Sequence, residues 1–217
     1  MTVSPGTGPV LGLVLAGGRA TRMGGGDKGL RPLGKRPLMG HVIRRLAPQV
    51  DTLAINAGGD PGRFADFALP VLPDSVPGHA GPLAGVLAGL DWAAEAGAPW
   101  IVTAAADTPF LPKRLVVALR AAAYARDTQF AVAAVPDTSF PSGYAPQPTF
   151  GLWPVACREE LRATLVAGKG KIMAFTKPRG LAEVVFEGAP FDPFFNVNTL
   201  ADLAEAEAML QAGAACG

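Results

Sequence analysis

The chain has 217 residues, and its 49% hydrophobic content is enough to form the core of a folded domain. Its 19 basic and 18 acidic residues give a formal net charge of +1. This balance excludes a sequence-independent nucleic-acid binder, because such binding needs many phosphate contacts from an excess of Lys and Arg. We expect one domain over 1–217, with flexible residues at 1–8 and a short tail at 213–217.

Cysteine and histidine content excludes several site types. Cys157 and Cys216 lie far apart, so neither a disulfide framework nor a Cys-x-x-Cys metal site is expected, and a reducing compartment is indicated. Two histidines are too few for a histidine-rich metal centre. The N-terminal segment lacks a basic stretch, and its apolar run is too short for a secretion signal or a membrane span. We therefore predict a cytoplasmic location, with no membrane and no nucleic acid as partner.

The predicted elements alternate between apolar runs and amphipathic segments, which is typical of βαβ units around a mainly parallel sheet. The first half predicts a strand at 10–15, a helix at 38–46, a strand at 52–56, a short helix at 63–67, a strand at 70–72, a helix at 83–95 and a strand at 100–106. The second half predicts a helix at 112–126, strands at 130–135 and 149–153, helices at 158–167 and 172–176, a strand at 182–186 and a helix at 199–211. Between them, the Pro-, Ser- and Gly-rich stretch 136–148 is predicted to be a long loop that acts as a lid.

The most informative segment is the loop after the first strand, which reads LAGGRATRMGGGDKG from Leu15 to Gly29. Its glycines permit close approach of backbone N–H groups to phosphate oxygens. Between Leu15 and Arg45 a single acid, Asp27, accompanies eight basic residues: Arg19, Arg22, Lys28, Arg31, Lys35, Arg36, Arg44 and Arg45. The segment therefore predicts a site for an anionic ligand.

Two common phosphate-binding motifs do not fit this loop. A dinucleotide fingerprint needs G-x-G-x-x-G, but Gly17 and Gly18 are adjacent and the next glycine is Gly24. A Walker A loop needs Gly-Lys followed by Ser or Thr, whereas Lys28 lies between Asp27 and a glycine. The alternative to a phosphate-binding loop is a flexible Gly-rich turn without a ligand.

The loop resembles the signature of nucleotidyltransferases, and in this form it is similar to the molybdenum cofactor guanylyltransferase (MobA) family. The resemblance continues in GPLAG at 81–85, DTPF at 107–110 and Asn-Val-Asn at 196–198, so it extends over nearly the whole chain. It implies an α/β fold of the nucleotide-diphospho-sugar transferase type, a Rossmann-like three-layer sandwich with a mainly parallel sheet. The resemblance also implies a Mg²⁺-dependent enzyme that transfers GMP from GTP to molybdenum-molybdopterin and releases pyrophosphate.

Asp107 directly follows a strongly apolar predicted strand, at the carboxyl end where open α/β sheets gather their ligand sites. Mg²⁺ is commonly bound by one or two carboxylates together with substrate phosphates, so one aspartate suffices. The alternative is that Asp107 caps the helix expected after Pro109. The resemblance supports the metal and adds Lys28 and Arg22 as triphosphate ligands, with Arg19 as a weaker candidate. No nucleophilic side chain is required, because phosphoryl-type transfer depends on positioning and charge stabilisation.

Nucleotide recognition is assigned through the resemblance. The implied GTP-binding residues are Leu15, Ala16, Gly17, Gly18, Lys28, Asn56, Asp74 and Asp107. Guanine offers donors at N1 and N2 and an acceptor at O6, and backbone groups of Leu15 and Gly17 are candidate partners. Ordinary turns are the alternatives for Asn56 and Asp74.

The resemblance also implies that Gly81, Asn196 and Asn198 lie on the molybdopterin side of the site. Both asparagine amides lie on one face if this segment is extended. Asn198 has two alternative roles: it could assist the metal, or it could cap the last helix. Gly81 and Gly85 are expected to bring a helix N-terminus near the ligand, with close helix packing as a compatible alternative. The alanines at 104–106 depart from the bulkier or polar residues of relatives, so the pocket floor is expected to differ.

Three functional alternatives remain open on the sequence: a cytidylyltransferase for the same cofactor, a sugar-phosphate or polyol-phosphate nucleotidyltransferase, and a non-catalytic cofactor carrier. The transferase and carrier hypotheses both include contact with an apo-molybdoenzyme or its chaperone as a further partner.

Overall fold

The protein was analysed as a computed structural model, which describes residues 4, 6–17, 26–76, 81–188 and 191–215. Its centre is a sheet in the order β5-β4-β1-β6-β8-β7-β9. The strands are β1 Val10–Leu15, β4 Thr52–Asn56, β5 Val71–Leu72, β6 Trp100–Ala105, β7 Phe130–Pro136, β8 Tyr144–Pro154 and β9 Leu181–Val185. Only β8 runs antiparallel to its neighbours in this sheet. The mainly parallel α/β sheet is confirmed.

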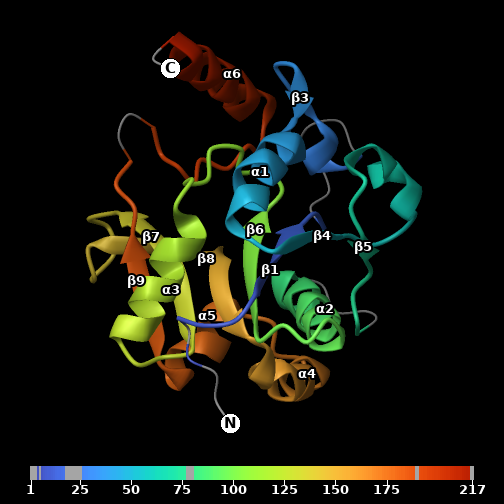
Figure 1. Cartoon of the computed structure of the whole chain (residues 1–217). Coiled ribbons are helices and arrows are strands. Elements are labelled where there is room, and N and C mark those ends of the chain that lie inside the picture. Colours follow the sequence, from blue (N-terminus) through green and yellow to red (C-terminus); the bar gives the residue numbers. More distant parts are fainter. Residues whose placement is uncertain (1–3, 5, 18–25, 77–80, 189–190, 216–217) are drawn as a thin grey trace.

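The helices form two layers, one on each face of the sheet (Figure 1). One layer holds α1 Leu38–Leu46 and α3 Leu115–Ala125. The other layer holds α2 Pro82–Glu95, α4 Arg158–Val166 and α5 Ile172–Thr176. Because both faces are covered, β1 and β6 are almost entirely apolar and buried, as their sequences predicted, with Thr103 of β6 as their polar exception.

Two short strands and a long helix form a smaller unit beyond the carboxyl edge of the sheet. β2 Pro32–Leu33 and β3 Arg36–Pro37 pair as a hairpin, and α6 Leu200–Ala215 packs against it (Figure 1). The buried side chains of this unit are Leu33, Leu38, Val197 and Ala206. Sequence reasoning missed the hairpin, and α6 extends into residues that were predicted to be a tail. Short 3₁₀ helices complete the described chain: η2 Lys28–Leu30, η3 Ala47–Gln49, η4 Pro61–Phe67, η5 Val155–Cys157 and η6 Lys177–Arg179.

The predicted lid at 136–148 is wrong in its second half. β8 begins at Tyr144, which pairs with Pro136, so the connection is a short turn at 137–143. Prolines at 146 and 148 had indicated a loop, because proline cannot donate to a β ladder. Here β6 pairs only with β8 residues 152–154, which leaves the first half of β8 as an edge on that side. Proline is tolerated at an edge.

Candidate active site

The predicted site residues of β1, β4 and β6 meet at one edge of the sheet. The three strands are parallel neighbours, and Leu15 pairs with Asn56 on one side and with Ala105 on the other. The ladder continues one residue further, where Ala106 N–H donates to the Leu15 carbonyl over 3.1 Å. Asp107 therefore leaves the sheet beside the end of β1, as the sequence predicted.

An ion pair joins the glycine-rich loop to the end of β6. Lys28 Nζ lies 2.5 Å from Asp107 Oδ2, and their side chains are only 11% and 16% exposed. The loop reaches this position because Gly29 is buried against Ala106, where an added Cβ on Gly29 would lie 3.0 Å from the Ala106 Cβ. The small side chain of Ala106 thus leaves room for the turn that presents Lys28 to Asp107.

Two asparagines complete the surroundings of Lys28. Its ammonium donates to Asn196 Oδ1 over 3.3 Å and also to Asn198 Oδ1. Val197 between them is fully buried, and its N–H donates to the Asp107 carbonyl over 3.0 Å. Val197 is thus buried while the amides on either side of it reach Lys28, and three side-chain oxygens converge on one cation.

The helix-cap alternatives for Asn198 and Asp107 are both wrong. Thr199 precedes α6, and its Oγ1 accepts the Asp202 N–H over 3.1 Å, while Asp202 Oδ2 accepts the N–H groups of Asn198 and Thr199. This reciprocal pair is a capping box. The Asn198 N–H also holds the pKa of Asp202 below its usual value. Asp107 is far from the start of α3, whose N-cap residue is Arg114.

A polar pair lies on the other side of the Leu15 backbone. Asn56, which is 5% exposed, donates its two amide hydrogens to the Leu72 carbonyl over 3.1 Å and to Asp74 Oδ1 over 3.0 Å. Its own oxygen points at α2, where a Cβ on Gly85 would lie only 2.1 Å away. Glycine at position 85 is therefore required for close packing, which is the structural role the sequence allowed. Asp74 is exposed and keeps its second oxygen available as an acceptor.

These groups surround a cavity of about 450 Å³, which we call the carboxyl-edge cavity. Its lining residues are Leu15, Gly17, Asn56, Gly58, Asp74, Gly81, Pro82, Ala105, Asp107, Thr149 and Asn196. Gly81 has φ of 130° and is the N-cap residue of α2, so the amino end of α2 opens into the cavity. The structure thus gathers seven of the predicted residues, while Lys28 and Asn198 adjoin the cavity through Asp107 and Asn196. Ala16 is buried beneath it and donates its N–H to the Asn56 carbonyl.

Three residues predicted for the site are not described, and two residues that line the cavity were not predicted. Gly18, Arg19 and Arg22 lie outside the described residues. Sequence reasoning missed Gly58 and Thr149. Gly58 follows the Asn56 strand end and was detectable as part of a Gly-Gly turn, whereas Thr149 arrives on the antiparallel strand β8 and carries no sequence signal.

Cys157, the cysteine that lies within the described residues, does not line this cavity. Cys157 is buried beside α4, and burial raises the pKa of its thiol to about 12. The thiol therefore stays protonated at neutral pH. Within the described residues, no group of three or more His, Cys, Asp or Glu side chains forms a metal site. None of the described helices has the length and apolar character needed to cross a bilayer.

Comparison with protein families gives a match over residues 12–184 to the MobA-like NTP transferase domain. The chain belongs to the MobA-like NTP transferase family. A molybdenum cofactor guanylyltransferase from Bradyrhizobium sp. (strain ORS 278) is 53% identical over 204 residues, which cover 93% of each chain. Another from Nitrobacter hamburgensis is 49% identical over 202 residues, which cover 92% of this chain and 93% of that protein.

Solved structures show the same fold at low sequence identity. The molybdopterin-guanine dinucleotide biosynthesis protein A from Archaeoglobus fulgidus has a TM-score of 0.70 at 20% identity, with 93% of this chain and 99% of that chain covered. The 4-diphosphocytidyl-2C-methyl-D-erythritol synthase from Anaerococcus prevotii also has a TM-score of 0.70, at 14% identity, with 93% and 96% covered. The predicted nucleotidyltransferase fold and enzyme class of this MobA-like chain are confirmed.

Proposed function

We propose that this MobA-like protein transfers GMP from GTP to molybdenum-molybdopterin and releases pyrophosphate. Relatives about half identical over at least 90% of the chain are named molybdenum cofactor guanylyltransferases, and this observation carries the choice of substrates. The carboxyl-edge cavity supports the chemistry, because it combines a buried cation, a carboxylate and a polar pocket. A phosphate oxygen of the acceptor forms a bond to the α-phosphorus of GTP, and the bond from that phosphorus to the bridging oxygen of pyrophosphate breaks. An acceptor phosphate that is already ionised needs no general base.

Lys28 binds the triphosphate in this proposal, and to do so its ammonium would leave the oxygens of Asp107, Asn196 and Asn198 that hold it in the free protein. Its ammonium is held by three oxygens in a site with little solvent, where a charge acts more strongly on a phosphate than in water. Arg22 is assigned to the same phosphates from the neighbouring part of the loop. The N–H groups of Gly17 and Gly18 and the amino end of α2 at Gly81 belong to the same binding surface. The Ala16 N–H is already bonded to the Asn56 carbonyl, so Leu15 and Ala16 contribute through the backbone position they give this turn.

The donor set around Lys28 fits a divalent cation. The oxygens of Asp107, Asn196 and Asn198 already converge on the Lys28 ammonium, and hard oxygen ligands of this kind suit Mg²⁺. We assign Asp107 as the metal ligand, with Asn198 as its companion and Asn196 on the molybdopterin side. Mg²⁺ bound there would neutralise charge on the phosphate oxygens and on the departing pyrophosphate.

Asn56 and Asp74 recognise the base. Both hydrogens of the Asn56 amide are already used and its oxygen packs against α2 at Gly85, so Asn56 acts by holding Asp74 in place. The second Asp74 oxygen is an acceptor that suits the N1 and N2 donors of guanine. Cytosine has no donor equivalent to N1–H at this position, which favours GTP over CTP.

Pyrophosphate release from GTP and molybdenum-molybdopterin tests the function, with CTP, ATP and UTP as competing donors. We expect turnover with GTP, Mg²⁺ dependence, and a loss of at least about 100-fold in kcat for Asp107→Asn. The control is Glu95→Gln, which removes an exposed carboxylate at the far end of α2. Preference for CTP, or for a sugar phosphate as acceptor, would replace the substrate assignment. Tight GTP binding without pyrophosphate release would favour the carrier alternative.

A further inference from the structure

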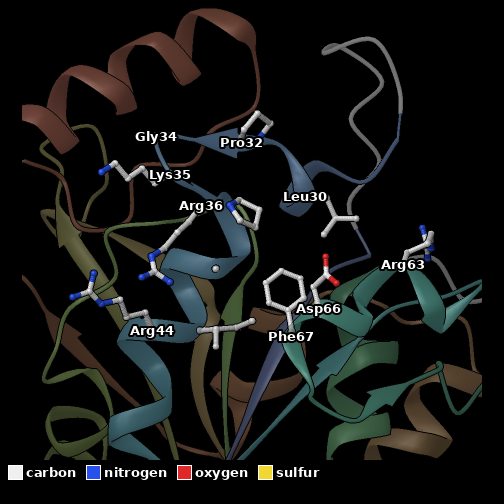
Figure 2. Close-up of a pocket in the computed structure, with 12 residues that line it drawn as sticks. Leu30, Pro32, Gly34, Lys35, Arg36, Arg44, Arg63, Asp66 and Phe67 are labelled. Carbon is white, nitrogen blue, oxygen red and sulfur yellow. The ribbon is translucent and has the colours of Figure 1, made fainter.

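A second hollow lies outside the carboxyl-edge cavity, between the β2–β3 hairpin, α1 and η4 (Figure 2). Its volume is about 730 Å³, compared with about 450 Å³ for the proposed active-site cavity. Four of the residues that line it are basic, namely Lys35, Arg36, Arg44 and Arg63, whereas Asp66 is its one acidic residue. No catalytic or nucleotide-binding role has been assigned to any of these residues.

Three of these cations form no ion pair with any acidic side chain in the described parts of the chain. Arg63 pairs with Asp27 and bonds to the Gly58 carbonyl. The exposed side chains of Lys35, Arg36 and Arg44 form no ion pair with any of the 18 acidic side chains, all of which lie in the described parts of the chain. We call these three residues the cationic ridge. The like charges of these three residues repel one another in the folded chain, so they favour binding of an anionic partner.

The cationic ridge separates two adjoining hollows. A further hollow of about 670 Å³ shares Gly34 and all three ridge residues with the first, and is completed by His41, Leu210 and Gln211. Apolar side chains lie on both sides of the ridge: Leu30, Ile43 and Phe67 in the first hollow and Leu210 of α6 in the second. Figure 2 shows Arg36 and Arg44 on the same side of the first hollow, with Phe67 and Asp66 opposite.

This arrangement suits an elongated ligand better than a small anion. A free phosphate would engage the guanidinium groups and leave the apolar side chains of both hollows uncovered. A polypeptide segment with carboxylates at its centre and apolar side chains on either side would pair with the cationic ridge and cover those apolar side chains. We propose that the cationic ridge is a docking surface for such an acidic segment of a partner protein. The surface is separate from the proposed active site, and its occupancy requires no GTP.

The test measures binding of a fluorescent peptide to the full chain by anisotropy. The peptide alternates glutamate pairs with single leucines, and a matched peptide carries glutamine in place of glutamate. We expect the glutamate peptide to bind, its affinity to fall as sodium chloride is raised, and the glutamine peptide to bind at least about tenfold more weakly. Arg36→Glu/Arg44→Glu should weaken the glutamate peptide by about tenfold or more, with guanylyl transfer to free cofactor retained.

The control Arg126→Glu/Lys177→Glu reverses two exposed cations at the other end of the sheet. It should bind the glutamate peptide within about twofold of the parent chain. Thermal unfolding checks the fold, and Arg36→Gln/Arg44→Gln replaces the charge reversal if that variant unfolds. Equal peptide binding by the ridge variant and the control would overturn the proposal. Displacement of the peptide by inorganic phosphate, but not by sodium chloride of equal ionic strength, would overturn it in favour of a small-anion site.

Discussion

Ser75 Oγ donates a hydrogen bond to Asp91 Oδ2 over 2.5 Å, and this contact ties the segment that carries Asp74 to α2. The other Asp91 oxygen accepts from Arg162 of α4 over 2.6 Å. A chain of contacts therefore runs from α4 through Asp91 and Ser75 to the neighbouring Asp74 and on to Asn56. Asp91 touches no proposed substrate position, so we regard it as a positioning residue for base recognition.

Asp91→Asn should raise the KM for GTP by about tenfold with little change in kcat. The reason is that a hydrogen bond to a charged group contributes about 1.5–3 kcal/mol, and about 1.4 kcal/mol is tenfold in binding. Ser75→Ala should shift KM in the same direction. Glu159→Gln is the matched control, because Glu159 also binds Arg162 but does not contact Ser75. A fall in kcat at constant KM, or an equal effect in the control, would refute this role.

Lys28→Met should lower kcat by about 100-fold or more, because it removes the charge that stabilises the triphosphate in the transition state. Lys28→Arg should recover only part of the rate, since the guanidinium is larger than the space defined by Asp107, Asn196 and Asn198. Single-turnover kinetics with GTP in excess isolates the chemical step. A Lys28→Met variant that keeps kcat within about threefold of the parent would remove Lys28 from the mechanism.

Gly85→Ala should destabilise the protein by about 1–3 kcal/mol and weaken GTP binding, because the new Cβ would overlap the Asn56 oxygen. Urea unfolding and titration with GTP provide the two measurements. Gly40→Ala in α1 is the control, since its Cβ would make only an ordinary contact 3.4 Å from Pro37. Alanine also favours a helix over glycine, so the control should be neutral or stabilising. Equal stability of both variants would contradict the close packing of α2 on Asn56.

The lowered pKa of Asp202 predicts that its contribution to the free energy of unfolding is lost in acid. Its pKa is lower in the folded chain than in the unfolded chain, first because the Asn198 N–H binds the carboxylate. The contribution is therefore fully present above the unfolded pKa of about 4 and is lost as pH falls through the lower folded pKa. The stability difference between the parent chain and Asp202→Asn should be largest at neutral pH and should shrink in acid. Glu205→Gln, an exposed neighbour on α6, should show no such trend, and a pH-independent difference for Asp202→Asn would contradict the prediction.

The sequence was most informative where local pattern and function coincide. The apolar runs of β1 and β6, the glycine-rich loop and the positions of Asn56 and Asp107 at strand ends were enough to predict a mainly parallel sheet and the edge that carries the site. The parallel pairing of β4, β1 and β6 then brings these ends together, as such a sheet requires. The prediction of a loop at 144–148 was wrong because it rested on the prolines. Proline breaks a strand only where a neighbouring strand would accept a hydrogen bond from the N–H that proline lacks.

The sequence by itself determined the fold class, the family and the residue types available for phosphate chemistry, because these depend on periodicity and on contiguous motifs. Only the tertiary structure decided that Lys28, Asp107, Asn196 and Asn198 converge, that Thr199 caps α6, and that Ser75 is fixed by Asp91. Each of these relationships joins residues through side-chain direction or packing between separate segments. Local sequence cannot specify them, since the contacts form only when the sheet and its helices are assembled.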